Sequence, residues 1–368
     1  MRGPPTSADW ICDVAALARV FERAVAQQRL YAAHVQLSWQ PLPLQLIHPF
    51  RIAHGTSSVR HNVLVRVEDG VGEAAAVHYH GETPERIVEY LRGVDLSEHS
   101  DPAQLEDIVS GLPVGSAAAR AGIDVALHDA WGRALGQPLY RLFGLNPERI
   151  PLTSFTIPLG SAEEMAERAR TTDAPVLKIK LGAESEDRAR IAALRSVTSV
   201  PLRVDANGGW TLAAAEALLP ELAEHGVELV EQPLAVGDLE GLRRLSRLRS
   251  RPPLFADESI KSAADILAHQ GLVEGVVIKL AKSGGIRAAL QQITLARSLG
   301  LDVMLGCMIE SSVAVTAAAH LGALCQYVDL DGPLLIRNDP FQGVTYQHGR
   351  LCLSARPGLG LLPVPTDP

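Results

Sequence analysis

The sequence feature that most constrains the fold is a repeated alternation of short strand-like runs and longer helical stretches after Pro151. Each run is rich in valine, leucine or isoleucine, and polar or glycine-containing turns join the runs to the helical stretches. Alternation of this kind predicts a parallel sheet whose crossover connections are helices. The eight expected strands are residues 153–157, 176–181, 202–205, 227–231, 254–257, 275–280, 303–307 and 327–330.

The number of these strands predicts the class of α/β fold. Eight parallel strands suit closure into a barrel of the TIM type. The alternative is an open, doubly wound sheet, but no Gly-x-Gly-x-x-Gly turn follows any of the expected strands. We therefore expect an α/β barrel.

The residues before the barrel follow another pattern, in which three β-like runs precede three helical stretches that start at Thr83, Ser100 and Ser116. The β-like runs are residues 35–39, 44–47 and 62–67. Strands followed by helices predict an α+β module built on an antiparallel meander. The expected division is an N-terminal extension of unknown role with an amphipathic helix near 14–28 (1–33), the α+β module (34–145), the barrel (146–343) and a Pro- and Gly-rich segment that returns to the first module (344–368).

Composition and charge narrow the function classes. The net charge of −8 argues against a broad basic face for nucleic acid, and no apolar run approaches the roughly 20 residues that span a membrane. The first fifteen residues lack the pattern of a secretory signal. Scattered cysteines predict neither zinc nor disulfides and suit a reducing cytoplasm; they are Cys12, Cys307, Cys325 and Cys352. We expect a cytoplasmic protein whose partners are small molecules or further copies of itself, as a homo-oligomer.

Lysines occur near the carboxyl ends of two expected strands, where a barrel builds its reactive face. Side chains alternate along the run 176–181, so Lys178 and Lys180 are expected to point into the barrel while the leucine and isoleucine residues beside them face the helices. A further inward lysine, Lys279, lies near the end of the sixth strand. Ammonium groups inside a barrel need compensating negative charge.

Three carboxylates can supply that charge. Asp205, Glu231 and Asp257 end three successive strands at intervals of 26 residues, so they are expected to occupy equivalent positions and to converge at the barrel mouth. Three converging oxygen ligands suit one Mg²⁺ ion better than zinc, which prefers histidine or cysteine. Taken alone, a Lys-x-Lys is usually a solvated strand and a strand-end aspartate usually caps a helix. Lysines, three acids and a lysine in this order on consecutive strands indicate a site.

This ordered set of charges resembles the enolase superfamily, specifically its muconate-lactonising subgroup. The resemblance covers about residues 44–343 and depends on the motifs Lys178-x-Lys180, Asp205, Glu231, Asp257-Glu258 and Lys279-x-x-Lys282-x-Gly284-Gly285. It implies a modified TIM barrel, (β/α)7β, under an N-terminal α+β capping domain, with the three carboxylates as ligands of one Mg²⁺. The mandelate-racemase subgroup would carry a histidine base on a late strand, and residues 305–310 contain none. Asn207, Glu258 and Lys282 are expected to support the ligands and lysines.

Within the subgroup, two further stretches resemble dipeptide epimerases: Cys-Met-Ile-Glu-Ser-Ser at 307–312 and Asp-Leu-Asp-Gly-Pro at 329–333. In those enzymes the Asp-x-Asp pair binds the α-ammonium group of the substrate, which implies this role for Asp329 and Asp331. The first stretch implies substrate contacts from Met308, Glu310 and Ser311. The alternative for the Asp-x-Asp pair is a simple turn before the following Gly-Pro.

The resemblance implies epimerisation of a dipeptide at its α-carbon by a two-base 1,1-proton transfer through an ene-diolate, which Mg²⁺ stabilises. Lys180 and Lys279 come from opposite sides of the barrel, so one can remove the proton while the other returns it to the opposite face. Lys178 is expected to hold the substrate carboxylate. Because a lysine base must lose its proton near neutral pH, burial and nearby positive charge are expected to lower its pKa from about 10.4.

Other functions share these residues. A cycloisomerase, an o-succinylbenzoate synthase or an N-acylamino-acid racemase would need the same lysines and metal, but their substrates lack a free α-ammonium. A metal-dependent aldolase or hydrolase on an unrelated barrel would call for histidine ligands or a metal-activated water and would leave the facing lysines unexplained. A non-catalytic binding protein that kept the barrel would not exchange substrate protons.

The loop between the first two strands, about residues 48–60, is expected to close over the substrate and to help choose its side chain. Similar epimerases that act on Ala-Glu carry an arginine in this loop, and Gly55 stands at that position here. Arg51 and Arg60 are close in sequence but do not match it. The resemblance therefore does not predict an acidic second residue in the dipeptide.

Overall fold

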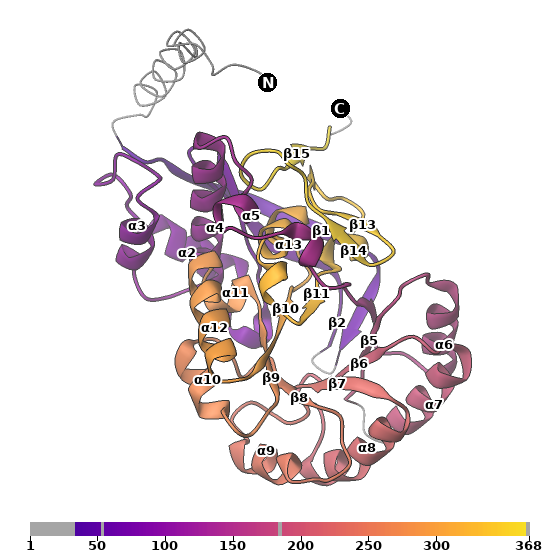
Figure 1. The fold of residues 1–368 in the computed structure, drawn as a ribbon. Helices are drawn as coiled ribbons and strands as arrows, with labels where there is room; N and C mark the ends of the chain where they lie inside the picture. The colour runs from indigo at the N-terminus through magenta and orange to yellow at the C-terminus, as the bar shows by residue number, and fades with distance from the viewer. Residues whose placement is uncertain (1–33, 53–54, 183–185, 366–368) are drawn as a thin grey trace, which may run out of the picture.

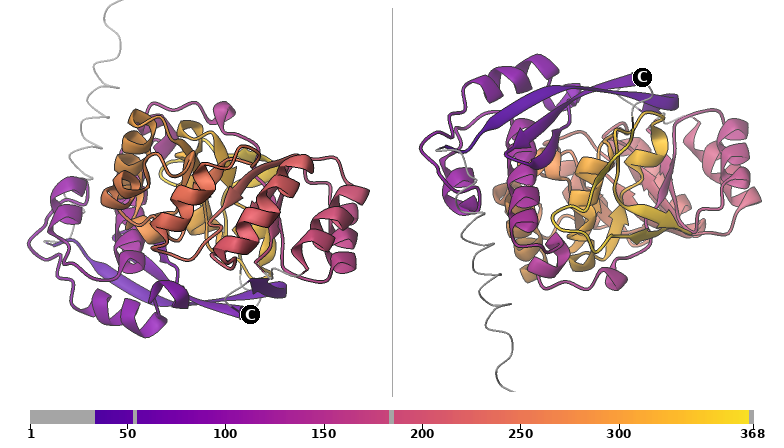
Figure 2. Two further views of the ribbon diagram at one scale, coloured as in Figure 1. Left: turned by 90° about the horizontal axis from the view of Figure 1, so that it is seen from below. Right: turned by 90° about the horizontal axis from the view of Figure 1, so that it is seen from above.

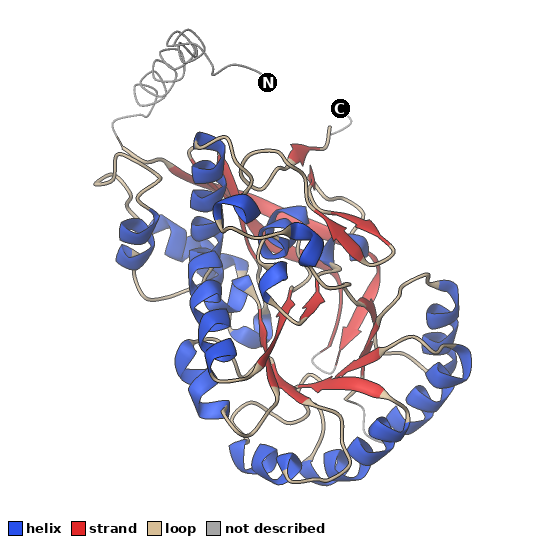
Figure 3. Cartoon of the chain, viewed as in Figure 1, coloured by secondary structure: helices blue, strands red, loops and turns tan. Residues whose placement is uncertain are grey.

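The computed structural model of the chain describes residues 34–52, 55–182 and 186–365. A curved row of parallel strands lies inside an arc of helices, and an antiparallel sheet with its own helices lies to one side of this barrel (Figures 1 and 2). Figure 3 shows strands on the inside of the barrel and helices on the outside. The helix expected near 14–28 falls outside the described residues. In the part of the chain that is described, no helix is long and apolar enough to cross a membrane.

The antiparallel sheet has three strands in the order β1-β2-β3. They are β1 Leu37–Ile52, β2 Gly55–Val67 and β3 Gly70–Ala74. The expected meander is confirmed, but the runs 35–39 and 44–47 merge into one continuous strand that contains Pro41 and Pro43. β1 is an edge strand, and a proline is tolerated there because its missing N–H faces no neighbouring strand.

The sequence pattern does not predict β3, whose two glycines weaken the strand signal. Its backbone lies directly against helix α4 (Ala117–Ala134). A Cβ atom on Gly70 would lie 2.1 Å from the carbonyl oxygen of Ala126, and one on Gly72 would lie 2.0 Å from that of Gly122. Glycine therefore allows a contact between strand and helix that any side chain would prevent.

The shorter helices of this module are η2 His78–His80, α2 Pro84–Arg92, α3 Leu105–Gly111 and α5 Leu139–Leu142. The predicted starts of α2 and α4 are confirmed, because the side chains of Thr83 and Ser116 accept backbone N–H groups as N-caps. The predicted start of α3 at Ser100 is wrong. Asp101 instead holds a turn by accepting the N–H of Ala103, and the helix begins at Leu105.

All eight expected barrel strands are confirmed, in the sheet order β11-β10-β9-β8-β7-β6-β5-β4. They are β4 Phe155–Ile157, β5 Leu177–Lys180, β6 Leu202–Asp205, β7 Val227–Glu231, β8 Leu254–Ala256, β9 Gly275–Ile278, β10 Asp302–Gly306 and β11 Tyr327–Asp329. Every pairing in this sheet is parallel. A bridge between Thr153 and Val328 brings the two ends of the row together, so the sheet is a nearly closed barrel.

Helices follow the first seven barrel strands and cover their outer side (Figure 1). They are α6 Ala162–Thr171, α7 Asp187–Val197, α8 Leu212–Glu224, α9 Leu239–Ser246, α10 Ala263–His269, α11 Leu280–Ser283, α12 Ile286–Ser298 and α13 Ser312–Ala319. Since β11 has no helix of this kind after it, the observed architecture is the (β/α)7β barrel that the resemblance implies.

The two ends of the barrel interior differ. Leu229, Phe255, Val277 and Met304 pack together and are fully buried in a layer below the strand ends. This layer closes the amino-terminal side of the barrel, as in TIM barrels generally. This layer leaves the carboxyl-terminal side of the barrel, under the antiparallel sheet, as the side on which a site can open.

The last part of the chain contains two short strand pairs. They are β12 Phe341–Gln342 with β15 Leu362–Pro363, and β13 Thr345–Gln347 with β14 Arg350–Cys352. The segment then reaches the residues around α5, where Gly358 donates its N–H to the carbonyl of Gln137 and accepts the N–H of Leu139 at 2.9 and 3.1 Å.

Candidate active site

Three carboxylates converge at the carboxyl ends of β6, β7 and β8. Asp205 pairs in register with Glu231, whereas Glu231 pairs with Phe255, so Asp257 lies two residues beyond the equivalent position. Because side chains alternate along a strand, a shift of two residues keeps Asp257 on the inner face. The ligand oxygens of the three buried residues all lie within 4.8 Å of one another. The predicted convergence is confirmed, with Asp257 just past the end of its strand.

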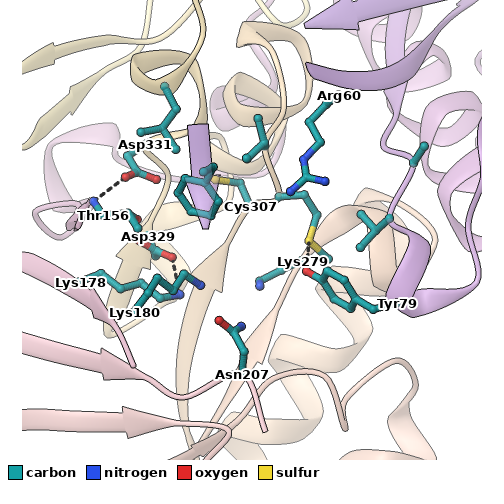
Figure 4. Close-up of a pocket in the computed structure, with 16 residues that line it drawn as sticks. Arg60, Tyr79, Thr156, Lys178, Lys180, Asn207, Lys279, Cys307, Asp329 and Asp331 are labelled. Carbon is teal, nitrogen blue, oxygen red and sulfur yellow. Dashed lines mark hydrogen bonds and ion pairs between the residues drawn. The ribbon is translucent and has the colours of Figure 1, made fainter. Parts of the chain in front are cut away.

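The three predicted lysines surround these acids, and each is buried, with 2% to 8% of its surface exposed. Lys180 lies in register with Asp205, and its Nζ is 2.6 Å from Asp205 Oδ2. Lys279 Nζ, from the end of β9, is 2.6 Å from Asp257 Oδ2. The side chains of Lys180 and Lys279 reach toward the same space from opposite sides of the barrel mouth (Figure 4). Lys178 Nζ lies lower and contacts Asp205, Glu231 and Asp329 at 3.0, 2.7 and 2.8 Å.

The alternation predicted for β5 explains how two lysines reach the interior. Leu177 and Ile179 are fully buried in the core that includes the outer helices. Lys178 and Lys180 point the other way and line the cavity above the barrel mouth.

The protein residues by themselves do not lower the pKa of Lys279 in the way expected for a base. Burial lowers the pKa of Lys279, but the carboxylates of Asp257 and Glu231 outweigh it, so the pKa lies well above its ordinary value. The pKa of Lys178 is raised in the same way, by Asp205 and Asp329 against the effect of burial. The acids that compensate these buried ammonium groups therefore outweigh the effect of burial, whereas positive charge beside a lysine acts in the opposite direction.

The acidic triad fits a hard divalent cation. Burial, and after it the neighbouring Asp205 and Asp257, raise the pKa of Glu231 well above its ordinary value, so the charged form of this carboxylate is not fully compensated by its neighbours. Neither carboxylate oxygen of Glu231 has a hydrogen-bond partner among the described residues, although Lys178 Nζ lies beside Oε2. Three carboxylates without histidine or cysteine are a ligand set for Mg²⁺. A bound ion would offset the repulsion among these acids.

Residues beside the triad hold it in place. Asn207 donates its backbone N–H to Asp205 Oδ1 at 2.9 Å and its side-chain amide to Glu258 Oε1 at 3.0 Å. Lys282 binds the carboxylate of Asp257 and donates to its carbonyl oxygen. The structure therefore brings Asn207, Glu258 and Lys282 to the triad, as the sequence predicts.

Asp329 and Asp331 lie side by side at the end of β11, but their surroundings differ. Asp329 is paired with Lys178 and also accepts the hydroxyl of Ser154 at 2.6 Å. Asp331 accepts the backbone N–H of Thr156 at 2.7 Å and has no cationic partner among the described residues. Burial and the nearby Asp329 raise the pKa of Asp331 to about 6. Both aspartates line the cavity, and only the carboxylate of Asp329 is paired with a cationic side chain of the described residues.

The predicted substrate contacts after β10 divide into two groups. Met308 lines the cavity. Glu310 and Ser311 are not among its lining residues, because the chain turns there toward the antiparallel sheet. Ser311 donates its N–H and hydroxyl to Glu73 of β3, and Glu310 accepts the N–H of Met308. These two residues thus fix the shape of the loop that carries Met308.

The antiparallel sheet and η2 form the upper wall of the cavity. Arg60 and Tyr79 reach it from β2 and η2, with Tyr79 in contact with the sulfur of Met308 (Figure 4). Arg51, the other arginine near the first loop, is exposed and does not line the cavity. Sequence position alone did not separate these two arginines. The signal that could have done so is the alternation of β2, which puts Arg60 on the same face of the strand as buried Asn62.

Comparison with known proteins agrees with this geometry. The model named Enolase C-terminal domain-like matches residues 161–365, and the Mandelate racemase / muconate lactonizing enzyme, N-terminal domain matches residues 40–144. The chain is 39% identical to the L-Ala-D/L-Glu epimerase of Bacteroides thetaiotaomicron over 90% of this chain and 88% of that protein.

Solved structures give the same result. A substrate-liganded L-Ala-D/L-Glu epimerase from Bacillus subtilis has a TM-score of 0.83 and 30% identity, covering 90% of this chain and 99% of that one. A dipeptide epimerase from Cytophaga hutchinsonii, complexed with Mg and D-Ala-L-Val, has a TM-score of 0.84 and 27% identity over 90% and 96% of the two chains. The chain belongs to the mandelate racemase/muconate lactonizing enzyme family of the enolase superfamily.

Proposed function

We propose that this protein is an isomerase that uses Mg²⁺ to epimerise a dipeptide at the α-carbon next to its carboxylate. The observation that carries the proposal is the pair of buried amines, Lys180 and Lys279, that approach the acidic triad from β5 and β9. Two bases on opposite sides of one carbon are what an inversion by proton transfer needs. The relatives that bind or epimerise dipeptides support the same conclusion.

The acids and the lysines of the site have different roles in the proposed reaction. Asp205, Glu231 and Asp257 would hold the ion, which when bound supplies positive charge to the substrate carboxylate and to the ene-diolate that forms from it. Lys180 removes the α-proton of one epimer and Lys279 delivers a proton to the opposite face of the same carbon. The two lysines exchange these roles for the other epimer. Lys178 lies deepest and orients the carboxylate.

Asp331 favours a dipeptide over the alternative substrates. Its carboxylate is buried in the cavity wall without a cationic partner among the described residues, which is costly unless a cation binds. The α-ammonium of a dipeptide supplies that cation. Substrates of a cycloisomerase, an o-succinylbenzoate synthase or an N-acylamino-acid racemase do not.

Proton exchange tests the function directly. The protein is incubated with Mg²⁺ in deuterated water and a pooled library of dipeptides, and products are examined by mass spectrometry. Substrates gain one mass unit at the α-carbon and appear as both epimers. If no dipeptide exchanges its α-proton at any Mg²⁺ concentration, the proposal is wrong, and a non-catalytic binding protein becomes the better description.

The domain boundaries, compartment and assembly extend the proposal. We place the capping domain at 34–145, the barrel at 146–343 and the returning segment at 344–368, supported by the contacts of Gly358 with the chain around α5. A cytoplasmic location suits the scattered cysteines. Limited proteolysis and light scattering would test the boundaries and the expected homo-oligomer.

A further inference from the structure

The charges that line the cavity are nearly all paired with one another. Lys178 and Lys180 bind Asp205, Lys279 binds Asp257, and Asp329 binds Lys178. Two charges in the lining are left over. One is the carboxylate of Asp331, which the α-ammonium of a dipeptide would satisfy.

The other is the guanidinium of Arg60. No carboxylate of the described residues lies within ion-pair or hydrogen-bond distance of it, although the side chain is half-buried in the cavity wall. Burial lowers the pKa of Arg60, which reflects the loss of water around its charge. Removing a guanidinium from water without a partner costs free energy. A bound anion would recover that cost.

The two unpaired charges lie on opposite sides of the cavity. In Figure 4, Asp331 lies on the side of β11 and Arg60 on the side of the antiparallel sheet, with Lys180 and Lys279 in the space below and between them. Arg60 is held in position by β2, where it pairs in register with Leu44 of β1.

The substituents of the reacting carbon follow from this arrangement. Its hydrogen points to Lys180 or Lys279, its carboxylate points down to the triad, and its nitrogen leads toward Asp331 through the first residue of the dipeptide. The remaining substituent is the side chain of the second residue. It has only the upper wall left to face, and Arg60 is the charged group there.

We propose that Arg60 is a specificity-determining residue that binds an acidic side chain on the second residue of the dipeptide, so that the preferred substrates end in glutamate or aspartate. This inference rests on the proposed function. It assigns to Arg60 a selection that the resemblance ties to the position of Gly55, at the start of the same strand.

A pair of nearly isosteric substrates tests the proposal. L-Ala-L-Glu and L-Ala-L-Gln differ only in the charged oxygen, so the ratio of their kcat/KM values reports on a charge in the upper wall. We expect the unmodified enzyme to prefer L-Ala-L-Glu by about 10- to 100-fold, the size of one charge-assisted hydrogen-bonded pair. In Arg60→Met the ratio should fall to near one, mainly through a rise in KM for L-Ala-L-Glu.

Two matched variants complete the experiment. Arg60→Lys keeps the charge without the fork of donors and should retain part of the preference. Arg66→Met removes an arginine from the same strand outside the cavity, and it should keep the full ratio. A ratio near one in the unmodified enzyme, or an unchanged ratio in Arg60→Met, overturns the proposal.

A binding measurement can distinguish a failure of this proposal from a failure of the proposed function. Calorimetry with Mg²⁺ and each dipeptide on Lys180→Ala measures the preference without turnover. Tighter binding of L-Ala-L-Glu that is lost in Lys180→Ala/Arg60→Met supports the role of Arg60 even if no epimerisation is found, and then only the proposed reaction fails. If neutral dipeptides are epimerised rapidly and Arg60→Met changes nothing, the proposed reaction stands and the role of Arg60 is refuted.

Discussion

In the barrel wall of the cavity, Lys178, Lys180 and Lys279 all have a carboxylate oxygen within 3 Å, and the acids form a compact triad. In the upper wall of the cavity, Arg60 has no carboxylate partner among the described residues. The three lysines and the triad are fixed by one another and by the strands, so they can hold their geometry without a ligand. Arg60 has no such partner and can bind an anion. Proton transfer is thus placed on the barrel, and selection of the second side chain on the capping domain.

The largest effects should come from the barrel wall. Lys180→Ala and Lys279→Ala should each lower kcat for epimerisation by up to about 10,000-fold, since each removes a positioned proton-transfer group. Each variant should still exchange the α-proton of one epimer with deuterium, seen by NMR, because the other lysine remains. Lys261→Ala, which changes an exposed lysine after β8, should be fully active. Normal epimerisation by either site variant would refute the two-base assignment.

The next effect is on stability and metal binding together. Asp257 binds the buried ammonium groups of Lys279 and Lys282, so Asp257→Asn should lower the free energy of unfolding by about 3–5 kcal/mol, measured in urea with EDTA. Mg²⁺ should raise the melting temperature of the unmodified protein but not of this variant. Glu216→Gln, which breaks a largely exposed pair with Arg244, should cost less than about 1 kcal/mol. Equal losses would mean that the triad is not the structural anchor described here.

A smaller effect should distinguish the two aspartates of β11. Asp331→Asn removes a charge without a cationic partner in the described chain, so KM for dipeptides should rise about 10- to 100-fold while the melting temperature does not fall. Asp329→Asn leaves Lys178 with one carboxylate fewer and should lower both kcat and the melting temperature. Similar kinetic and stability profiles for the two variants would contradict their division into a binding and a structural residue.

The barrel and its charges could be predicted from the sequence because both depend on short-range patterns. Strand alternation fixes which face Lys178 and Lys180 occupy, and the repeat of 26 residues carries Asp205, Glu231 and Asp257 to the same end of the barrel. The sequence did not reveal the offset of Asp257, since that depends on where β8 ends against its neighbours.

The upper wall of the cavity could not be predicted in the same way. β3 exists because glycines allow its backbone to touch α4, and the prolines of β1 are tolerated because it is an edge strand, so both depend on tertiary neighbours. Alternation along β2 can place Arg60 on one face of the strand, but that face meets the cavity only because the whole sheet lies across the barrel mouth. Its role therefore also depends on a contact between modules.

The smallest effect should appear away from both walls, where α5 and the returning segment pack on the end of α13. His320 is buried there, with its Nδ1 accepting the N–H of Tyr140 at 3.0 Å and its ring stacked on that of Tyr140. Burial lowers the pKa of His320 to about 4, although a contact with the carbonyl of Leu359 raises it. Nδ1 can accept a hydrogen bond only while it carries no proton.

The folded state therefore binds fewer protons at His320 than the unfolded chain, whose histidine titrates near 6.5. The stability that comes from this difference is present in full above pH 6.5 and is lost as the pH falls toward 4. At pH 5.5 the loss should be about 1.4 kcal/mol, one pKa unit below the unfolded value. Urea denaturation from pH 7 to 4.5 should show a shallower decline for His320→Gln than for the unmodified protein. Parallel curves would mean that His320 titrates at the same pH in the folded and the unfolded protein, which would contradict the effect of burial described here.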